Sequence, residues 1–216
     1  MLKSNKHVFW EALLVSITIF IVGLFLGMLI ETSNSNKISQ LYTQSEISLS
    51  DAKTATSLLQ TTQIDCDEKI KFYTSLADEI YKEARQLELY EDSGKITDTM
   101  KLLHKKYDLL RTILWGSSQQ HLKDCDDYNT IAYLYLYNTE NINTKATQNV
   151  WSKLLSELKE NRPNTMLIPI ASDQNLTSLD VLTTQYDITQ YPAIIINNDQ
   201  ILYQIDNITT LQSVLD

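Results

Sequence analysis

Two cysteines, Cys66 and Cys125, are the residues of this 216-residue chain whose type and spacing best suit chemistry. Their thiols could close a structural disulfide or exchange a disulfide with a partner protein. A metal site is an alternative, because His121 precedes Cys125 by four residues and Asp124 and Asp126 flank that cysteine. Zinc prefers four ligands and paired Cys-x-x-Cys spacing, which the sequence lacks. We therefore expect a disulfide and no metal site, with two buried free thiols as the remaining alternative.

Other catalytic chemistry has no recognisable signature in this sequence. A Gly-rich phosphate loop, His-Glu-x-x-His, Gly-x-Ser-x-Gly and a paired-carboxylate motif are all missing. Asp and Glu are numerous but scattered, and His104 stands beside Lys105 and Lys106 in a helical pattern, which indicates a solvated side chain. We expect no catalytic residue and no cofactor.

An apolar segment runs from Val8 to Ile30 and contains one charge, Glu11. At about 1.5 Å per residue, a helix over this segment spans roughly 34 Å, enough to cross a hydrocarbon core of about 30 Å. A cleaved signal peptide is the alternative, but its apolar region is normally about 7–15 residues long and ends at a small-x-small site, which is missing here. Lys3 and Lys6 precede the segment, so the positive-inside rule places residues 1–7 in the cytoplasm. We expect a single-pass protein of the cell membrane whose C-terminal part is extracytoplasmic.

Gly23 and Gly27 form a small-xxx-small pair inside this predicted transmembrane helix. Such a pair lets two membrane helices approach closely, so it predicts a possible homodimer or another helix–helix contact. The alternative is that glycine is simply common in membrane helices.

Residues 31–63 are rich in Ser and Thr and predict a helical stalk. Apolar residues recur at helical spacing, but Ser45 and Ser48 interrupt the stripe. The pattern indicates a weakly amphipathic helix or a partly ordered spacer rather than a strong coiled coil.

Residues 64–125 predict a long antiparallel helical hairpin of coiled-coil character. Apolar positions advance in steps of four and three on both sides of a short turn that contains Gly94. They are Cys66, Ile70, Tyr73, Ala77, Ile80, Ala84 and Leu87, then Ile96, Met100, Leu103, Tyr107, Leu110 and Leu114. In this register Cys66 and Cys125 face each other to within about one helical turn. We expect the second helix to loosen at Gly116 and so absorb the mismatch.

Residues 128–216 alternate β-branched or aromatic runs with helical patterns. Strands are predicted at 130–137, 166–171, 193–196 and 201–203, and helices at 146–161, 178–186 and 209–215. The predicted order is β-α-β-α-β-β-α. The whole chain is thus expected to be an α+β protein with an N-terminal transmembrane helix, a long helical hairpin and a C-terminal α/β domain.

That order resembles the thioredoxin fold, and the segment from Tyr186 to Ile196 makes the resemblance specific. There Tyr191-Pro192 stands before a strand, a polar turn and a second strand, as the cis-proline does in thioredoxins. The resemblance implies a thioredoxin-like domain over about residues 128–216 with a cis bond before Pro192. It also implies a shallow peptide groove at Tyr191 and Pro192, although Pro192 could serve only to shape the loop.

The departure from thioredoxins lies just after the first predicted strand. Thioredoxins carry Cys-x-x-Cys there, whereas residues 138–147 contain no cysteine. Disulfide exchange requires a thiolate and a resolving partner, so we expect this domain to be redox-inactive. Tyr133, Tyr135 and Tyr137 share one face of that strand, which we expect helices to cover.

The formal charge of −9 makes the chain acidic, without a basic stripe. This balance excludes nucleic acid as a partner and argues against adhesion to anionic lipid. Our leading hypothesis is a membrane-anchored extracytoplasmic binding or scaffold protein with an unidentified protein or peptide partner. The alternatives are an envelope thiol–disulfide redox protein that uses Cys66 and Cys125, and a structural subunit of a membrane complex.

Overall fold

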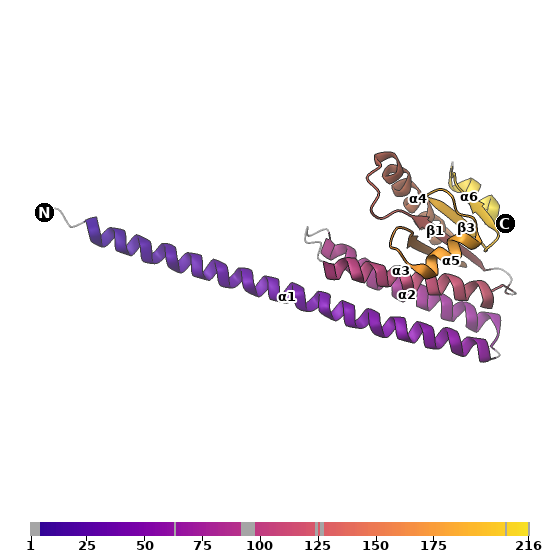
Figure 1. Cartoon of the computed structure of the whole chain (residues 1–216), viewed down its shortest axis with the longest axis horizontal. Coiled ribbons are helices and arrows are strands. Elements are labelled where there is room, and N and C mark those ends of the chain that lie inside the picture. The colour runs from indigo at the N-terminus through magenta and orange to yellow at the C-terminus, as the bar shows by residue number, and fades with distance from the viewer. Residues whose placement is uncertain are drawn as a thin grey trace. The chain divides into compact units, whose positions relative to one another are not determined.

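The computed structural model describes residues 5–62, 64–91, 98–123, 125, 128–205 and 207–215 (Figure 1). The chain divides into two compact units, Met1–Thr43 and Gln44–Asp216, and the helix α1 (Asn5–Thr61) contributes to both. Four groups of residues used in the predictions above lie outside the described residues. They are Lys3, the turn with Gly94 and Ile96, Asp124 and Asp126.

The first unit contains the apolar part of α1. No proline interrupts the sequence there, and the side chains from Val8 to Ile30 are exposed. Thr18 Oγ1 donates to the Leu14 carbonyl oxygen at 2.8 Å, so this hydroxyl is satisfied within the helix, as an apolar surrounding requires. In the part of the chain that the structure describes, α1 is the one helix with the length and hydropathy to cross a membrane. The length and hydropathy of α1 therefore support the predicted membrane span.

The second unit begins with residues 44–61 of α1, which pack against α2 (Cys66–Glu91) and α3 (Asp98–His121). Ser48 Oγ donates to Glu83 Oε1 of α2 at 3.0 Å, and Glu46 forms an ion pair with Lys106 of α3. Small residues make up the buried stripe of α1: Ser45, Ser48, Ala52 and Thr56.

The interpretation of Ser45 and Ser48 as interruptions of the α1 stripe is therefore wrong. Both side chains are buried, with exposed fractions of 0% and 7%. The Ser48 hydroxyl also donates to the Gln44 carbonyl oxygen one turn earlier, as Thr56 does to Ala52. Because these hydroxyls find partners on their own helix, they can be buried at a close helix–helix contact without an unpaired donor.

The helices α2 and α3 lie side by side as the predicted hairpin (Figure 1). Ten of the stepped positions that were predicted for the seam are buried: Tyr73, Ala77, Ile80, Ala84 and Leu87 on α2, and Met100, Leu103, Tyr107, Leu110 and Leu114 on α3. Cys66 and Ile70, at the start of α2, are half-buried. Steps of four and three keep these residues on one face of each helix, and the facing stripes then exclude water from each other.

The C-terminal residues form a mixed sheet in the order β2-β1-β3-β4. The central strand β1 (Asn129–Tyr135) runs parallel to the edge strand β2 (Thr165–Ala171). On its other side β1 is antiparallel to β3 (Ala193–Ile196), which pairs in turn with β4 (Gln200–Leu202). The helices between and after them are α4 (Ile142–Asn161), α5 (Thr177–Gln185) and α6 (Ile208–Leu215). The predicted order of strands and helices is confirmed.

Each face of this sheet carries its own helices. Alternate residues of β1 and β3 form a core with Trp151, Leu155 and Leu158 of α4 and Leu211 of α6. The helix α3 contacts β2 and packs against α5. The sheet and the helical hairpin thus belong to one folded unit, and the edge strand β2 lies where that hairpin meets the sheet.

Candidate functional site

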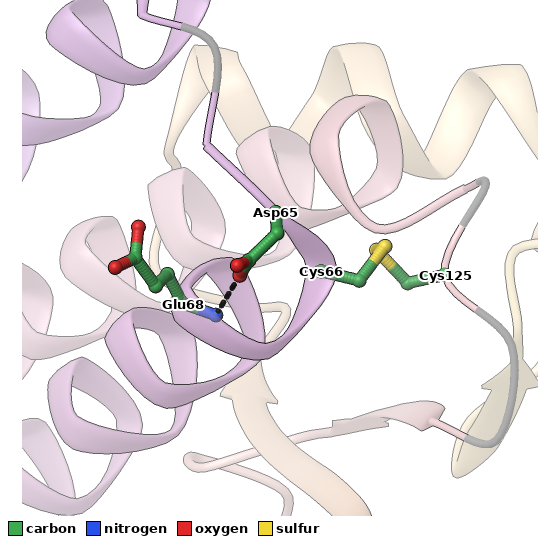
Figure 2. Close-up of a disulfide and its surroundings, with 4 residues drawn as sticks. All are labelled: Asp65, Cys66, Glu68 and Cys125. Atoms are coloured by element: carbon green, nitrogen blue, oxygen red, sulfur yellow. Dashed lines mark hydrogen bonds between the residues drawn. A yellow bond between two sulfur atoms is a disulfide. The ribbon is translucent and has the colours of Figure 1, made fainter.

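The predicted disulfide between Cys66 and Cys125 is present, with Cα atoms 5.5 Å apart (Figure 2). Cys66 is the first residue of α2, and Asp65 caps this helix by accepting from the Glu68 backbone N–H at 2.9 Å. Cys125 lies beyond the end of α3. The expected loosening at Gly116 is wrong, because α3 continues without a break through Gly116 to His121, and the chain after the helix brings Cys125 to its partner.

His121, the proposed alternative metal ligand, instead contacts Tyr73 of α2. Its Nδ1 lies 2.5 Å from the Tyr73 hydroxyl oxygen. Burial and the nearby Lys69 lower the pKa of His121, and burial raises the pKa of Tyr73 to about 12. Because the Cys125 sulfur is bonded to Cys66, the residues at this place form a structural cluster that joins α2 to the end of α3.

A groove with a volume of about 690 Å³ lies between α2, α4 and the edge strand β2. This volume falls in the range of about 300–1,000 Å³ that is typical of ligand sites. We call it the basic groove. Its charged and aromatic lining comes from Tyr81 and Arg85 of α2, Arg111 of α3, and Lys145 and Lys159 of α4, and its floor from Tyr133, Tyr135, Leu167 and Pro169.

The floor of the basic groove is apolar because the edge strand is incompletely covered. The register pairs Tyr133 with Pro169, so both point to the face of the sheet that α4 covers. Leu167 and Pro169 remain half-buried there, whereas Tyr133 is buried. The Tyr133 and Tyr135 rings stack with centroids 5.6 Å apart. Burial raises the pKa of Tyr133, so its phenol stays neutral and the floor carries no charge.

Among the residues that the structure describes, the walls of the basic groove carry four cations and a single carboxylate, that of Glu160. Arg111 has a structural role, since its Nη1 lies 3.2 Å from Asp108 Oδ1 and both side chains are nearly buried. Lys159 pairs with the exposed Asp78 at 3.0 Å. Lys145 is exposed and pairs with no carboxylate of the described chain. The basic groove is thus a positive site on an acidic protein.

Gln148 fixes the end of the basic groove next to Lys145. Its Oε1 accepts from the Leu136 backbone N–H at 2.9 Å, and its Nε2 donates to the Leu136 carbonyl oxygen at 3.0 Å. The residue is buried, and it holds the chain just after β1 against α4. Sequence reasoning missed Gln148, although a glutamine one turn before Trp151 on the apolar face of a helix was a signal that a buried amide has a partner.

The start of α4 is closed by its own cap. Asn141 Oδ1 accepts from the backbone N–H groups of Asn143 and Thr144, at 2.9 and 3.2 Å. Asp173 accepts in the same way from the backbone N–H groups of Tyr137 and Asn138, at 2.9 and 2.6 Å. These carboxylate and amide contacts order the loop between β1 and α4.

The expectation that the His104 side chain is solvated is wrong, because its ring lies against Tyr137. The two rings lie 4.8 Å apart, and the imidazole is half-buried rather than solvated. The expected helical cover of the tyrosine face is confirmed for Tyr133, whose ring contacts Trp151 of α4 and whose hydroxyl donates to the Gln148 carbonyl oxygen.

The other predicted site residues lie away from the basic groove. The Tyr191–Pro192 peptide bond is cis, as expected, with Tyr191 half-buried and Pro192 buried. Neither residue lines the basic groove. On α1, a Cβ atom placed at Gly23 or at Gly27 would meet nothing within 4 Å, so both positions leave the helix surface open. Peptide binding at Tyr191 and helix pairing at the glycines stay predictions.

A second cavity, of about 1080 Å³, lies among α3, the end of α4 and the β3–β4 turn. Two of its asparagines, Asn197 and Asn198, have structural partners. Asn197 Oδ1 accepts from the Thr130 backbone N–H at 2.8 Å, and Asn198 Oδ1 accepts from Trp115 Nε1 at 3.2 Å. Both asparagines have positive φ, which the tight turn requires. These two amides therefore hold the turn and α3 in place within the fold.

Comparisons of the chain with known protein families, with curated proteins and with solved structures find no match. The functional assignment therefore rests on the geometry and charge of the second unit.

Proposed function

We propose that this chain is a membrane-anchored, extracytoplasmic binding protein that holds a segment of a partner protein in the basic groove. The first unit anchors it through α1, and the second unit is a redox-inactive, thioredoxin-like domain joined to a helical hairpin. The observation that carries the proposal is the basic groove itself, which combines an apolar floor with cationic walls beside the edge strand β2. Apolar surface supplies affinity and charges at the walls supply orientation.

The location of the second unit is supported by two features. The helix α1 is long and apolar enough to span a membrane, and the lysines at the N-terminus favour a cytoplasmic start. The disulfide between Cys66 and Cys125 fits an oxidising compartment, because thiols in reducing compartments are mostly kept free.

The thioredoxin-like assignment is supported by the strand order β2-β1-β3-β4, with β1 and β2 parallel. The cis bond before Pro192 at the start of β3 supports it further. Residues 138–147 contain no cysteine, so the domain has no thiol in the place where thioredoxins have two. Binding without disulfide exchange is the activity that this arrangement favours.

A redox function is the second candidate, because Cys66 is half-buried at the first position of a helix. A helix N-terminus favours a thiolate, but Asp65, Asp67 and Glu68 surround this cysteine and oppose one. We therefore expect the full chain not to reduce insulin above the uncatalysed rate. Turnover that Cys66→Ser abolishes would replace the binding proposal by the redox one.

A structural subunit is the third candidate, favoured by the open helix surface at Gly23 and Gly27. Replacing both glycines by isoleucine in the full chain separates it from the binding proposal. A loss of the partner on this replacement, with an unchanged yield of folded protein, would assign recruitment to α1 rather than to the basic groove.

Photocrosslinking in intact cells tests the binding proposal. A photoreactive phenylalanine analogue replaces Lys145 in the full chain, and a matched variant carries it at Lys153, which is exposed on the same helix and lies outside the groove. We expect a discrete crosslinked protein from position 145 and none from position 153. Equal crosslinking from both positions, or none from position 145, would refute a partner in the groove.

A further inference from the structure

The basic groove is cationic, whereas the protein as a whole is acidic. This contrast indicates that an occupant of the groove carries negative charge. The chain has 27 acidic and 18 basic residues, yet the described residues that line the groove include four cations and one carboxylate. These cations come from α2, α3 and α4, so only the fold makes them neighbours. On an acidic protein, such a site attracts anionic groups that the remaining surface repels.

The cations that line the groove differ in their contacts and in their exposure. Arg111 is held by Asp108 inside the fold. The pair between Lys159 and Asp78 is exposed at both side chains, 37% and 59%, and an exposed pair of this kind contributes little and exchanges readily. Lys145 is exposed at the N-terminal end of α4, and Arg85 is exposed on α2 across the groove. Lys145 and Lys159 on one wall and Arg85 on the other thus present positive charge on both sides of the apolar floor.

A phosphorylated small molecule fits this site poorly. Phosphate is usually cradled by the free backbone N–H groups of a helix N-terminus. Here Asn141 already accepts from the N–H groups of Asn143 and Thr144 at the start of α4. The floor also offers the half-buried Leu167 and Pro169 and the stacked Tyr135, which suit an apolar side chain.

We propose, building on the function proposed above, that the basic groove selects an extended, acidic segment of a partner protein. Carboxylates on both sides of one aromatic or aliphatic side chain meet Lys145 and Lys159 on one wall and Arg85 on the other, while that side chain lies on Tyr135 and Leu167. Pro169 has no backbone N–H and interrupts the donors of β2, so recognition depends on side chains rather than on a continuous added strand.

Binding of labelled peptides to the full chain in neutral phosphatidylcholine nanodiscs tests this selectivity. One ten-residue peptide carries Asp and Glu on both sides of a Phe, and its control carries Asn and Gln instead. Fluorescence anisotropy should show the acidic peptide binding at least about tenfold more tightly, with an affinity that falls as salt is added. Equal affinities of the two peptides would overturn the proposal.

Matched charge reversals test whether the acidic peptide binds at the cations of the basic groove. Lys145→Glu and Arg85→Glu should each lower the affinity of the chain for the acidic peptide by about three- to tenfold. Lys153→Glu and Lys82→Glu reverse exposed charges on the same two helices outside the groove, and should change the affinity by less than about twofold. An equal loss in the control variants would overturn the proposal. If a reversal prevents folding, the charge-neutral Lys145→Gln and Arg85→Gln provide the same comparison.

Two further outcomes separate this inference from the function on which it rests. Crosslinks from position 145 in cells, combined with equal binding of the acidic and amide peptides, would overturn the acidic selectivity and leave the binding function standing. Binding of the protein to vesicles that contain phosphatidylserine, with no binding of either peptide, would replace the protein segment by an anionic lipid surface as the occupant.

Discussion

Asp108 Oδ1, on α3, accepts a hydrogen bond from the backbone N–H of Ala171, the last residue of β2, at 3.1 Å. The same oxygen accepts from Arg111 Nη1 at 3.2 Å. The Asp108 side chain is buried, and burial raises its pKa, although the Arg111 charge and the Ala171 N–H partly offset this effect. One carboxylate therefore joins the helical hairpin to the edge strand that forms the floor of the basic groove.

Asp108→Ala should lower the stability of the second unit by about 3–5 kcal/mol, because it leaves Arg111 and the Ala171 N–H without their buried partner. Asp108→Asn should lower the stability by less, since an amide oxygen can still accept from the Ala171 N–H. Thermal unfolding of the full chain in mild detergent measures both variants. Wild-type melting temperatures for Asp108→Ala would show that the hairpin docks on the sheet without this carboxylate.

The disulfide should stabilise the fold by closing a long loop. Cys66 and Cys125 are separated by 59 residues, for which the chain-entropy model gives about 4 kcal/mol. Replacing both cysteines by serine should lower the free energy of unfolding by about 2–5 kcal/mol. Reductant should lower the melting temperature of the wild type and leave the double variant unchanged. Free thiols that alkylate in the untreated native protein would mean that the bond does not form.

Glu83 should make the packing of α1 on the hairpin depend on pH. Burial raises its pKa above the ordinary value of 4.5, while hydrogen bonds from Ser48 and Gln44 oppose the rise. Its Oε2 is buried with no hydrogen-bond partner within the described chain. Because the native state binds this proton more tightly than the unfolded state, the stability that Glu83 contributes is present below about pH 4.5 and is lost as the pH rises through the native pKa.

Glu83→Gln isolates this effect, because the amide mimics the protonated acid at every pH. We expect the variant to be more stable than the wild type at neutral pH, and the difference to shrink towards pH 4.5. Comparing the two proteins cancels His121, whose lowered pKa acts in the opposite direction. Glu157→Gln, an exposed position of α4, serves as the control. A difference that does not vary with pH would show that Glu83 is not buried as a carboxylate.

The sequence predicted the elements well because their signals are local. The strands and helices of residues 128–216 and the buried steps from Tyr73 to Leu114 follow from the periodicity of side chains along one element. The disulfide was predictable because a register between two regular helices fixes which residues face each other. The path of the chain to Cys125 was not predictable, since contacts with the rest of the fold set the end of α3 at His121.

The candidate site could not be predicted from the sequence in the same way. Arg85 and Lys145 lie 60 positions apart on exposed helix faces, and only tertiary packing makes them two walls of one groove. Ser48 and Glu83 look like solvated residues, since polar side chains are usually exposed. They are buried where Ser48 Oγ donates to Glu83 Oε1 across the interface between α1 and α2. Polarity alone predicts exposure, and a specific partner overrides it.

The proposed orientation of the chain rests on the charges around the apolar segment. Protease added outside intact, wall-stripped cells should remove the chain from Thr32 onward and spare an N-terminal tag, because Lys3 and Lys6 hold that end inside. Lysed cells provide the control, in which the tag is digested as well. A protected C-terminal tag in intact cells would reverse the topology and place the disulfide in the reducing compartment.

Hydrogen–deuterium exchange of the full chain, with and without the saturating acidic peptide, tests most directly that the basic groove is the binding site. We expect slower exchange in residues 77–85 of α2, 142–152 of α4 and 165–170 of β2, which line the groove or adjoin it. The cis-proline loop at Tyr191 and Pro192 lies outside the groove and should exchange at an unchanged rate. Slower exchange confined to residues 186–193, or no change anywhere while the peptide is bound, would contradict the account.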